Sequence, residues 1–193
     1  QRDAKGLRDI GFGVVNSHRS NGVHRGTSFT IGLIDNQNES YRIISDKTAE
    51  HFSFTRSVTS NQSYPSSTMG AMALIRQLYY DADWYSQGIS ESKDLALESV
   101  INNRKLPKIF DANDKLNVYR AAKISEEFDL EFVIKGSGKE YENVRELKKF
   151  NNKLIIPVNF PNAFDVSNAK LNEKLTINQL RYWNQAPANL GIL

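Results

Sequence analysis

Polar residues stand at the ends of three short apolar runs, and they are the side chains best placed to do chemistry. The runs span 108–112, 131–135 and 154–158. Their far ends read Asp111-Ala112-Asn113, Lys135-Gly136-Ser137 and Asn159-Phe160-Pro161. An Asp carboxylate can act as a general base or bind a cation, and a Lys amine can act as a base or anchor an anion. Asp111 and Lys135 are therefore the candidate catalytic residues.

Further candidates come from the same strand ends and from one basic loop. The loop, predicted at 16–27, carries two His-Arg pairs, which could form a rim around an anionic ligand. The candidate ligand-binding residues are His24, Arg25, Asn113, Ser137 and Asn159. No residue is assigned to a metal.

Each candidate also has a purely structural interpretation. An Asp at a strand end often bonds to loop amides, Asn113 and Asp114 fit the cap of a following helix, and Lys135 can point to solvent. The Gly-Ser-Gly stretch at 136–138 could cradle a phosphate, although a tight turn explains the same residues. A solvated loop would explain 16–27. A packed or surface residue is the simpler interpretation of the isolated His51.

Two amphipathic segments, 114–128 and 140–150, separate the three apolar runs. Short apolar strands that alternate with helices predict an α/β fold, in which a parallel sheet is covered on both faces. In such folds chemistry sits at the carboxyl ends of the strands. The strand ends named above are therefore the predicted site.

The remaining elements surround this unit. We expect a helix at 3–10, a buried parallel strand at 12–15, a β-hairpin at about 28–45 with its turn at 35–38, and an ordered loop at 46–63. The longest helix is predicted at 66–85, with Ser66 or Ser67 at its start. Its buried stripe would comprise Ala71, Leu74, Ile75, Leu78, Ala82 and Tyr85. Further helices are expected at 93–103 and after a capping box that begins at Thr176, with Leu180 and Trp183 facing inward.

Composition excludes several classes of protein. There is no cysteine, so disulfides and thiolate metal sites are ruled out. The 25 basic and 22 acidic residues are interspersed, so no nucleic-acid partner is expected. No apolar run is long enough to span a membrane, and a soluble protein is expected. Because the first residue is Gln, we expect the chain to be part of a longer protein. The sequence leaves the compartment of that protein open, including the periplasm and the outside of the cell.

Several stretches together resemble the amidohydrolase superfamily. They are residues 8–15, 25–27, 64–70 together with 73–77, 183–187 and the block 107–161. The sequence is most similar to imidazolonepropionase-like amidohydrolases, in particular to large bacterial proteins whose amino-terminal half is such a domain. The resemblance covers nearly the whole chain. It implies a (β/α)₈ TIM barrel and metal-dependent hydrolysis, with zinc as the family's metal, of C–N bonds other than peptide bonds.

The same resemblance implies that metal ligands are missing. The family places a His-x-His motif at the end of its first barrel strand, and this chain contains no such motif. Where the family has further histidines, the chain has Asp111, Asn113 and Gly136. A hydrolytic zinc ion needs about three protein ligands and an open position for water. We therefore expect no cofactor in this chain alone.

Taken together, residues 1–193 are expected to form one amidohydrolase-like segment, a partial (β/α)₈ barrel with an inserted β-hairpin. A complete barrel takes about 250 residues. Two classes of function remain: part of a metal-dependent hydrolase that is inactive by itself, or a degenerate, non-catalytic barrel domain that serves a structural, ligand-binding or docking role. The expected partners are the missing part of the barrel or a second amidohydrolase domain of the same protein, with self-association as the alternative.

Overall fold

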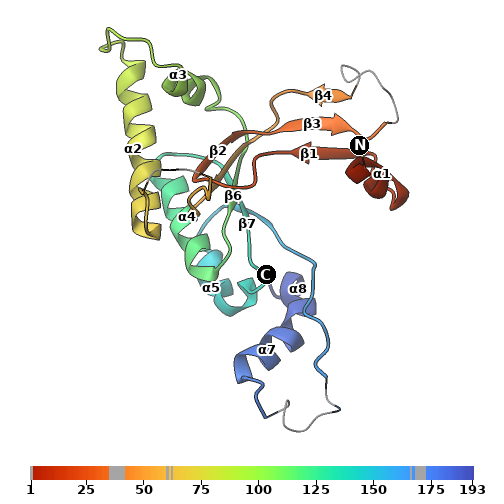
Figure 1. The fold of residues 1–193 in the computed structure, drawn as a ribbon. Coiled ribbons are helices and arrows are strands. Elements are labelled where there is room, and N and C mark those ends of the chain that lie inside the picture. Colours follow the sequence, from red (N-terminus) through yellow and green to blue (C-terminus); the bar gives the residue numbers. More distant parts are fainter. Residues whose placement is uncertain (1, 35–41, 60, 62, 166, 168–172) are drawn as a thin grey trace.

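A five-stranded sheet forms the centre of the protein (Figure 1). The computed structural model describes residues 2–34, 42–59, 61, 63–165, 167 and 173–193. The strand order is β2-β5-β6-β7-β8. Their bounds are β2 His24–Thr27, β5 Glu50–Ser53, β6 Lys108–Asp111, β7 Phe132–Lys135 and β8 Lys153–Ile155. The last four strands run parallel, and β2 is antiparallel to β5.

The three apolar runs are confirmed as neighbouring parallel strands, which makes this an α/β protein. The third strand is shorter than expected, because β8 ends at Ile155 rather than at 158. Within the described residues the outer strands β2 and β8 do not pair with each other, so the sheet is open.

Two expectations about the first third of the chain are wrong. The strand at 12–15 is not part of the parallel sheet: β1 (Val14–Ser17) pairs with β3 (Phe29–Gly32), which pairs with β4 (Ile43–Ser45), in a separate antiparallel sheet. The fourth parallel strand is β5, inside the segment expected to be a loop. Three of its four residues are polar, and tertiary contacts rather than local hydrophobicity make them buried. The predicted β3–β4 hairpin is confirmed, and its turn at 35–38 lies outside the described residues.

Several helices begin at a side-chain cap, and Ser67 and Asp114 are caps that the sequence predicts. In α2 (Thr68–Ser86) the Ser67 side chain accepts a hydrogen bond from the Gly70 amide. Asp94 and Asp114 cap α3 (Leu95–Asn102) and α4 (Lys115–Glu127) in the same way. The predicted helix at 140–150 is instead a short 3-10 turn, η2 (Glu140–Asn143), followed by α5 (Val144–Leu147). The described residues also form the helical elements α1 (Arg2–Asp9), α7 (Ile177–Gln185), η3 (Ala186–Ala188) and α8 (Asn189–Ile192).

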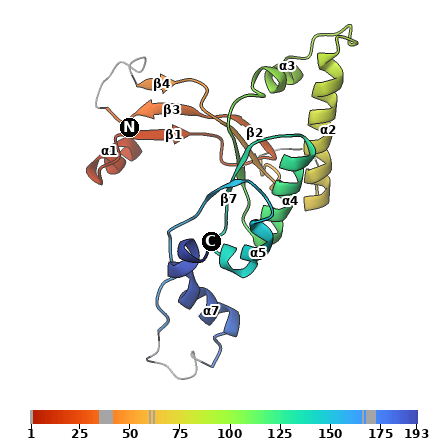
Figure 2. The ribbon, with the colours of Figure 1, turned by 180° about the vertical axis from the view of Figure 1, so that it is seen from behind.

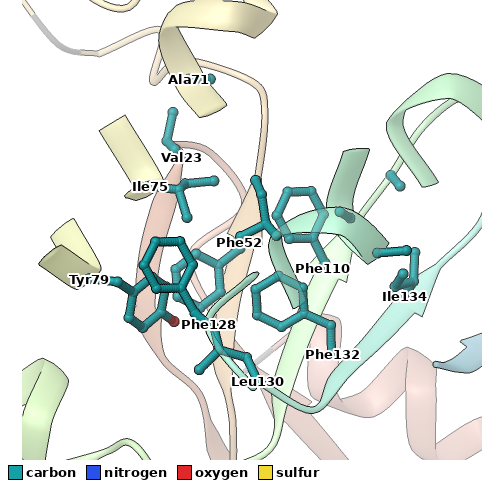
Figure 3. Packing of buried hydrophobic residues seen from close by; sticks show 14 of the residues in the cluster. Val23, Phe52, Ala71, Ile75, Tyr79, Phe110, Phe128, Leu130, Phe132 and Ile134 are labelled. Atoms are coloured by element: carbon teal, nitrogen blue, oxygen red, sulfur yellow. The ribbon is translucent and has the colours of Figure 1, made fainter. Parts of the chain in front are cut away.

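The hydrophobic core lies between the sheet and the helices α2 and α4 (Figure 3). Phe52, Phe110 and Phe132 come from three adjacent strands, and Phe110 and Phe132 have ring centroids 5.4 Å apart. Tyr79 of α2 packs on Phe128, which follows α4, at 5.2 Å. Because side chains alternate along a strand, residues such as Asp111 and Lys135 lie on the opposite face of the sheet.

The buried side of α2 differs from the predicted stripe. Ala71, Ile75 and Ala82 are buried as expected, and Tyr79, which was not in the stripe, joins them. Leu74 is 39% exposed, and it lines a surface pocket beside Val23 and His24 instead of entering the core. Periodicity predicted the helix, and packing on the sheet decided which residues of its apolar side are buried.

The carboxyl-terminal helix α7 begins at its predicted capping box, formed by Thr176 and Gln179. The expectation that Leu180 and Trp183 face inward is wrong, since they are 41% and 46% exposed. The reason is the position of α7, which projects away from the sheet in both ribbon views (Figures 1 and 2). None of the helices in the described part of the chain is both long and apolar enough to cross a membrane.

The difference between Ile75 and Leu74 gives a stability test. Ile75 is 1% exposed, so Ile75→Ala should lower the free energy of unfolding by about 2–5 kcal/mol, through lost burial and the cavity left behind. Leu74→Ala, one position earlier on the same helix, should cost less than about 1 kcal/mol. Urea denaturation of both variants measures these values. Equal losses would show that the wrong face of α2 has been assigned to the core.

Candidate functional site

The two predicted catalytic residues lie side by side. Asp111 and Lys135 are the last residues of β6 and β7 and are paired in the strand register. The Lys135 Nζ is 3.4 Å from the Asp111 Oδ1. The side chains are 32% and 51% exposed, so both reach solvent on the open face of the sheet. Their proximity follows directly from the parallel arrangement of the two strands.

Arg25 approaches the same carboxylate from the other side. Its Nη1 donates to the Asp111 Oδ2 at 3.1 Å, and its Nε donates to the Gly22 carbonyl oxygen at 3.3 Å. The Arg25 side chain is only 6% exposed. A buried guanidinium with fixed partners is a rigid structural element, so Arg25 holds the Asp111 carboxylate in place.

Two histidines that lie far apart in the sequence are stacked beside Arg25 and Asp111. His51 of β5 and His18, which follows β1, have ring centroids 3.8 Å apart and planes 8° apart. The His18 Nδ1 lies 2.7 Å from the Arg19 carbonyl oxygen. A carbonyl oxygen only accepts, so the His18 Nδ1 is the donor, and in the neutral ring Nε2 carries the lone pair. The His51 Nε2 is buried and has no hydrogen-bond partner among the described residues.

The environment of His51 favours its neutral form. Burial, followed by the charges of His18 and Arg25, lowers the pKa of His51 to about 4, against a smaller opposing effect of Asp111. His51 is therefore an uncharged imidazole near neutral pH. It can donate one hydrogen bond and accept another.

These residues line a cavity of about 280 Å³ on the open face of the sheet. Asn16 and His18 line it from the β1 side, and Arg25, His51, Asp111 and Lys135 line it from the larger sheet. The cavity is thus formed where the amino-terminal sheet meets the carboxyl ends of the parallel strands. Of the predicted ligand-binding residues, only Arg25 is in it.

His24 lies on the other face of the sheet. Because it neighbours Arg25 on strand β2, the two side chains point in opposite directions. The His24 ring stacks on Phe52 with centroids 4.7 Å apart, and its Nε2 is 3.5 Å from the Glu50 Oε1. A loop would have allowed His24 and Arg25 to converge, whereas the strand separates them.

Asn113 and Ser137 line a second, larger cavity of about 720 Å³ that also includes Lys115, Lys139 and Arg181. The amides of the Gly-Ser-Gly stretch, however, already bind a carboxylate of the chain itself. Glu140 is 2% exposed and accepts hydrogen bonds from the Ser137 and Gly138 amides, the latter at 3.1 Å. The loop that could have cradled a phosphate is thereby occupied by Glu140.

Asn159 is exposed in the segment that follows β8, four residues beyond the end of the strand. It lines neither of the two cavities described above. The early end of β8 is the reason: the strand stops before it can carry Asn159 to the edge where Asp111 and Lys135 lie.

The residues present do not fit a hydrolytic zinc ion. Across the described part of the chain, no three His, Cys, Asp or Glu side chains group closely enough to hold a metal. Asp111, the carboxylate at the centre of the cluster, lies between the cationic groups of Arg25 and Lys135, which repel a cation. A zinc site needs about three ligands, and this cluster offers fewer.

Comparison with solved structures identifies one similar fold. A crystal structure of an amidohydrolase from Thermotoga maritima MSB8 superposes with a TM-score of 0.65 at 17% sequence identity, over 91% of this chain and 49% of that chain. The chain has an amidohydrolase-like fold. It spans about half the length of the Thermotoga protein, and at this identity the likeness concerns the fold alone. No family model and no curated protein sequence matches the chain.

The lowered pKa of His51 predicts a pH effect on stability. In the unfolded chain a His has a pKa of about 6.5, so between about pH 6.5 and 4 the unfolded state binds a proton that the folded state does not. Stability should therefore fall as the pH is lowered through this range. The ring signals of His51 in a two-dimensional NMR titration should reveal a midpoint near 4.

His51→Gln, which cannot take up this proton, should make the free energy of unfolding less dependent on pH between 6.5 and 4. His24→Gln is the matched control on the opposite face of the sheet. A midpoint for His51 at its ordinary value would contradict the buried position assigned to the ring.

Proposed function

We propose that this chain is a segment of an amidohydrolase-related protein of the imidazolonepropionase-like kind, and that the whole protein, rather than this chain alone, hydrolyses C–N bonds other than peptide bonds. The observation that carries this proposal is the pairing of Asp111 and Lys135 at the carboxyl ends of two parallel strands, in a chain with an amidohydrolase-like fold. In (β/α)₈ barrels the reacting groups stand at this end of the strands. Asp111 is the general-base candidate, and Lys135 is the cation beside it.

The open sheet supports assignment of the chain to part of a barrel. Four parallel neighbouring strands are half of the eight that a (β/α)₈ barrel contains, and the chain matches about half of the Thermotoga protein. On this assignment the face that carries Asp111 and Lys135 is the inner face of the barrel. The antiparallel sheet β1-β3-β4 would then be an addition to the barrel.

The surface of the chain supports a missing partner. Its accessible area is 13110 Å², whereas a compact monomer of this mass exposes about 9,300 Å². Exposed apolar residues lie at the end of the edge strand β8, in the segment after it and on α7. They are Ile155, Val158, Phe160, Leu180 and Trp183. We propose that the remaining barrel strands, or a second amidohydrolase domain of the same protein, cover them.

The chain by itself should neither bind zinc nor hydrolyse amides. After exposure to zinc and dialysis, elemental analysis should find well below one zinc per chain, and a cyclic amide should remain intact. The reason is the lack of a three-ligand group in the described residues, together with the two cations beside Asp111. The opposite result would be one tightly held zinc per chain that is lost in Asp111→Ala but kept in Asp46→Ala, a control at an exposed position. That result would show that this site holds the metal of a metal-dependent hydrolase.

Exposed apolar surface predicts association. At high concentration, multi-angle light scattering should give a mass above the 21.9 kDa of one chain. Addition of the missing barrel half should replace these assemblies with a defined complex and shield Trp183 from a fluorescence quencher. A monodisperse monomer whose Trp183 stays equally accessible would argue against the half-barrel assignment.

A further inference from the structure

The cavity around His51 carries more positive than negative charge. Arg25 and Lys135 are both cationic near neutral pH, and Asp111 supplies one carboxylate between them. With His51 neutral, Arg25, Lys135 and Asp111 together carry a net charge of about +1. Arg25 is fixed by Asp111 and Gly22, whereas Lys135 makes one long contact of 3.4 Å within the described part of the chain, which leaves donors of its ammonium group available. A small anion would balance this charge.

His51 provides a second and independent indication of a ligand. The residue lines the cavity and only 4% of its surface is exposed, yet its Nε2 has no partner among the described residues. A buried polar group without a hydrogen bond is destabilising, and most such groups in proteins have a partner. As a neutral imidazole, His51 can donate from Nε2 to an oxygen that enters the cavity.

We propose that this cavity binds a small monocarboxylate, whose oxygens accept hydrogen bonds from Lys135 Nζ and His51 Nε2 while Arg25 holds Asp111 in place. This deepens the function proposed above by naming the ligand class of the same site, and it rests on that site. A single negative charge matches the net charge of the cluster, whereas a phosphate dianion would add repulsion from Asp111. A volume of about 280 Å³ is large enough to admit such a ligand.

The three histidines of the chain make the binding test specific. His18 and His51 lie in the cavity, and His24 lies on the opposite face of the sheet. In a ¹³C–¹H NMR titration at pH 7 and constant ionic strength, sodium acetate should shift the ring signals of His18 and His51 and leave His24 unchanged. Sodium phosphate should shift them less, and sodium chloride should not shift them.

Variants then identify the donors. Lys135→Met should weaken acetate binding about tenfold, because it removes the charge but preserves the length of the side chain. Lys153→Met, on the exposed strand β8, is the matched control and should bind acetate as the unaltered chain does. His51→Gln should weaken binding as well, and the unchanged His24 signals would show that the sheet is intact.

Several results would overturn the proposal: no shift of His18 and His51, equal shifts of all three histidines, or equal affinities for Lys135→Met and Lys153→Met. Stoichiometric zinc uptake that shifts His18 and His51 would show a metal site instead. Acetate binding is measured without turnover, so its absence would refute the ligand class while leaving the hydrolase assignment to be judged by the zinc and light-scattering measurements.

Discussion

The buried charge pair between Glu50 and Lys108 fixes the register on which both faces of the sheet depend. The two residues are opposite each other at the starts of β5 and β6, each side chain is 2% exposed, and the Lys108 Nζ is 3.6 Å from the Glu50 Oε2. A shift of one residue would turn Phe52 out of the core and His51 into it. An uncompensated charge in the core would make that alternative costly.

Lys108 also connects the sheet to the preceding helix. Its Nζ donates to the carbonyl oxygens of Arg104 at 2.7 Å and Leu106 at 3.0 Å, in the turn between α3 and β6. Burial lowers the pKa of Lys108, and the charge of Glu50 acts in the opposite direction. Burial of Tyr79, together with the negative charge of Glu50, raises the pKa of the Tyr79 hydroxyl. The polar groups of this face thus serve the architecture, which leaves the opposite face for a ligand.

On that opposite face the polar residues are arranged differently. Arg25 and Asp111 are joined by a hydrogen-bonded ion pair, but Lys135 is half exposed. Among the described residues, buried atoms without a hydrogen-bond partner occur on both sides of the sheet: the Glu50 Oε2 and the Tyr79 hydroxyl on the core side, and the His51 Nε2 on this one. The half-exposed Lys135, which lines a cavity at the carboxyl ends of the strands, is therefore the physical reason to treat this cluster as a site.

The sequence alone determined the parallel unit β6-β7-β8, the helices α2 and α4 and the pairing of Asp111 with Lys135. These features follow from local patterns: apolar runs, helical periodicity, Asp and Ser caps, and the rule that parallel strands present their carboxyl ends at one edge. The sequence did not reveal β5, because Glu50, His51 and Ser53 do not look like a buried strand until Lys108 and the neighbouring backbone supply their partners. Tertiary structure also decided which other residues lie beside Asp111 and Lys135. Strand β2 directs Arg25 toward Asp111 and His24 away from it. The contact between the two sheets stacks His18 on His51. Contacts between residues so distant in the chain have no local signal, since they depend on the register and the face that each strand adopts.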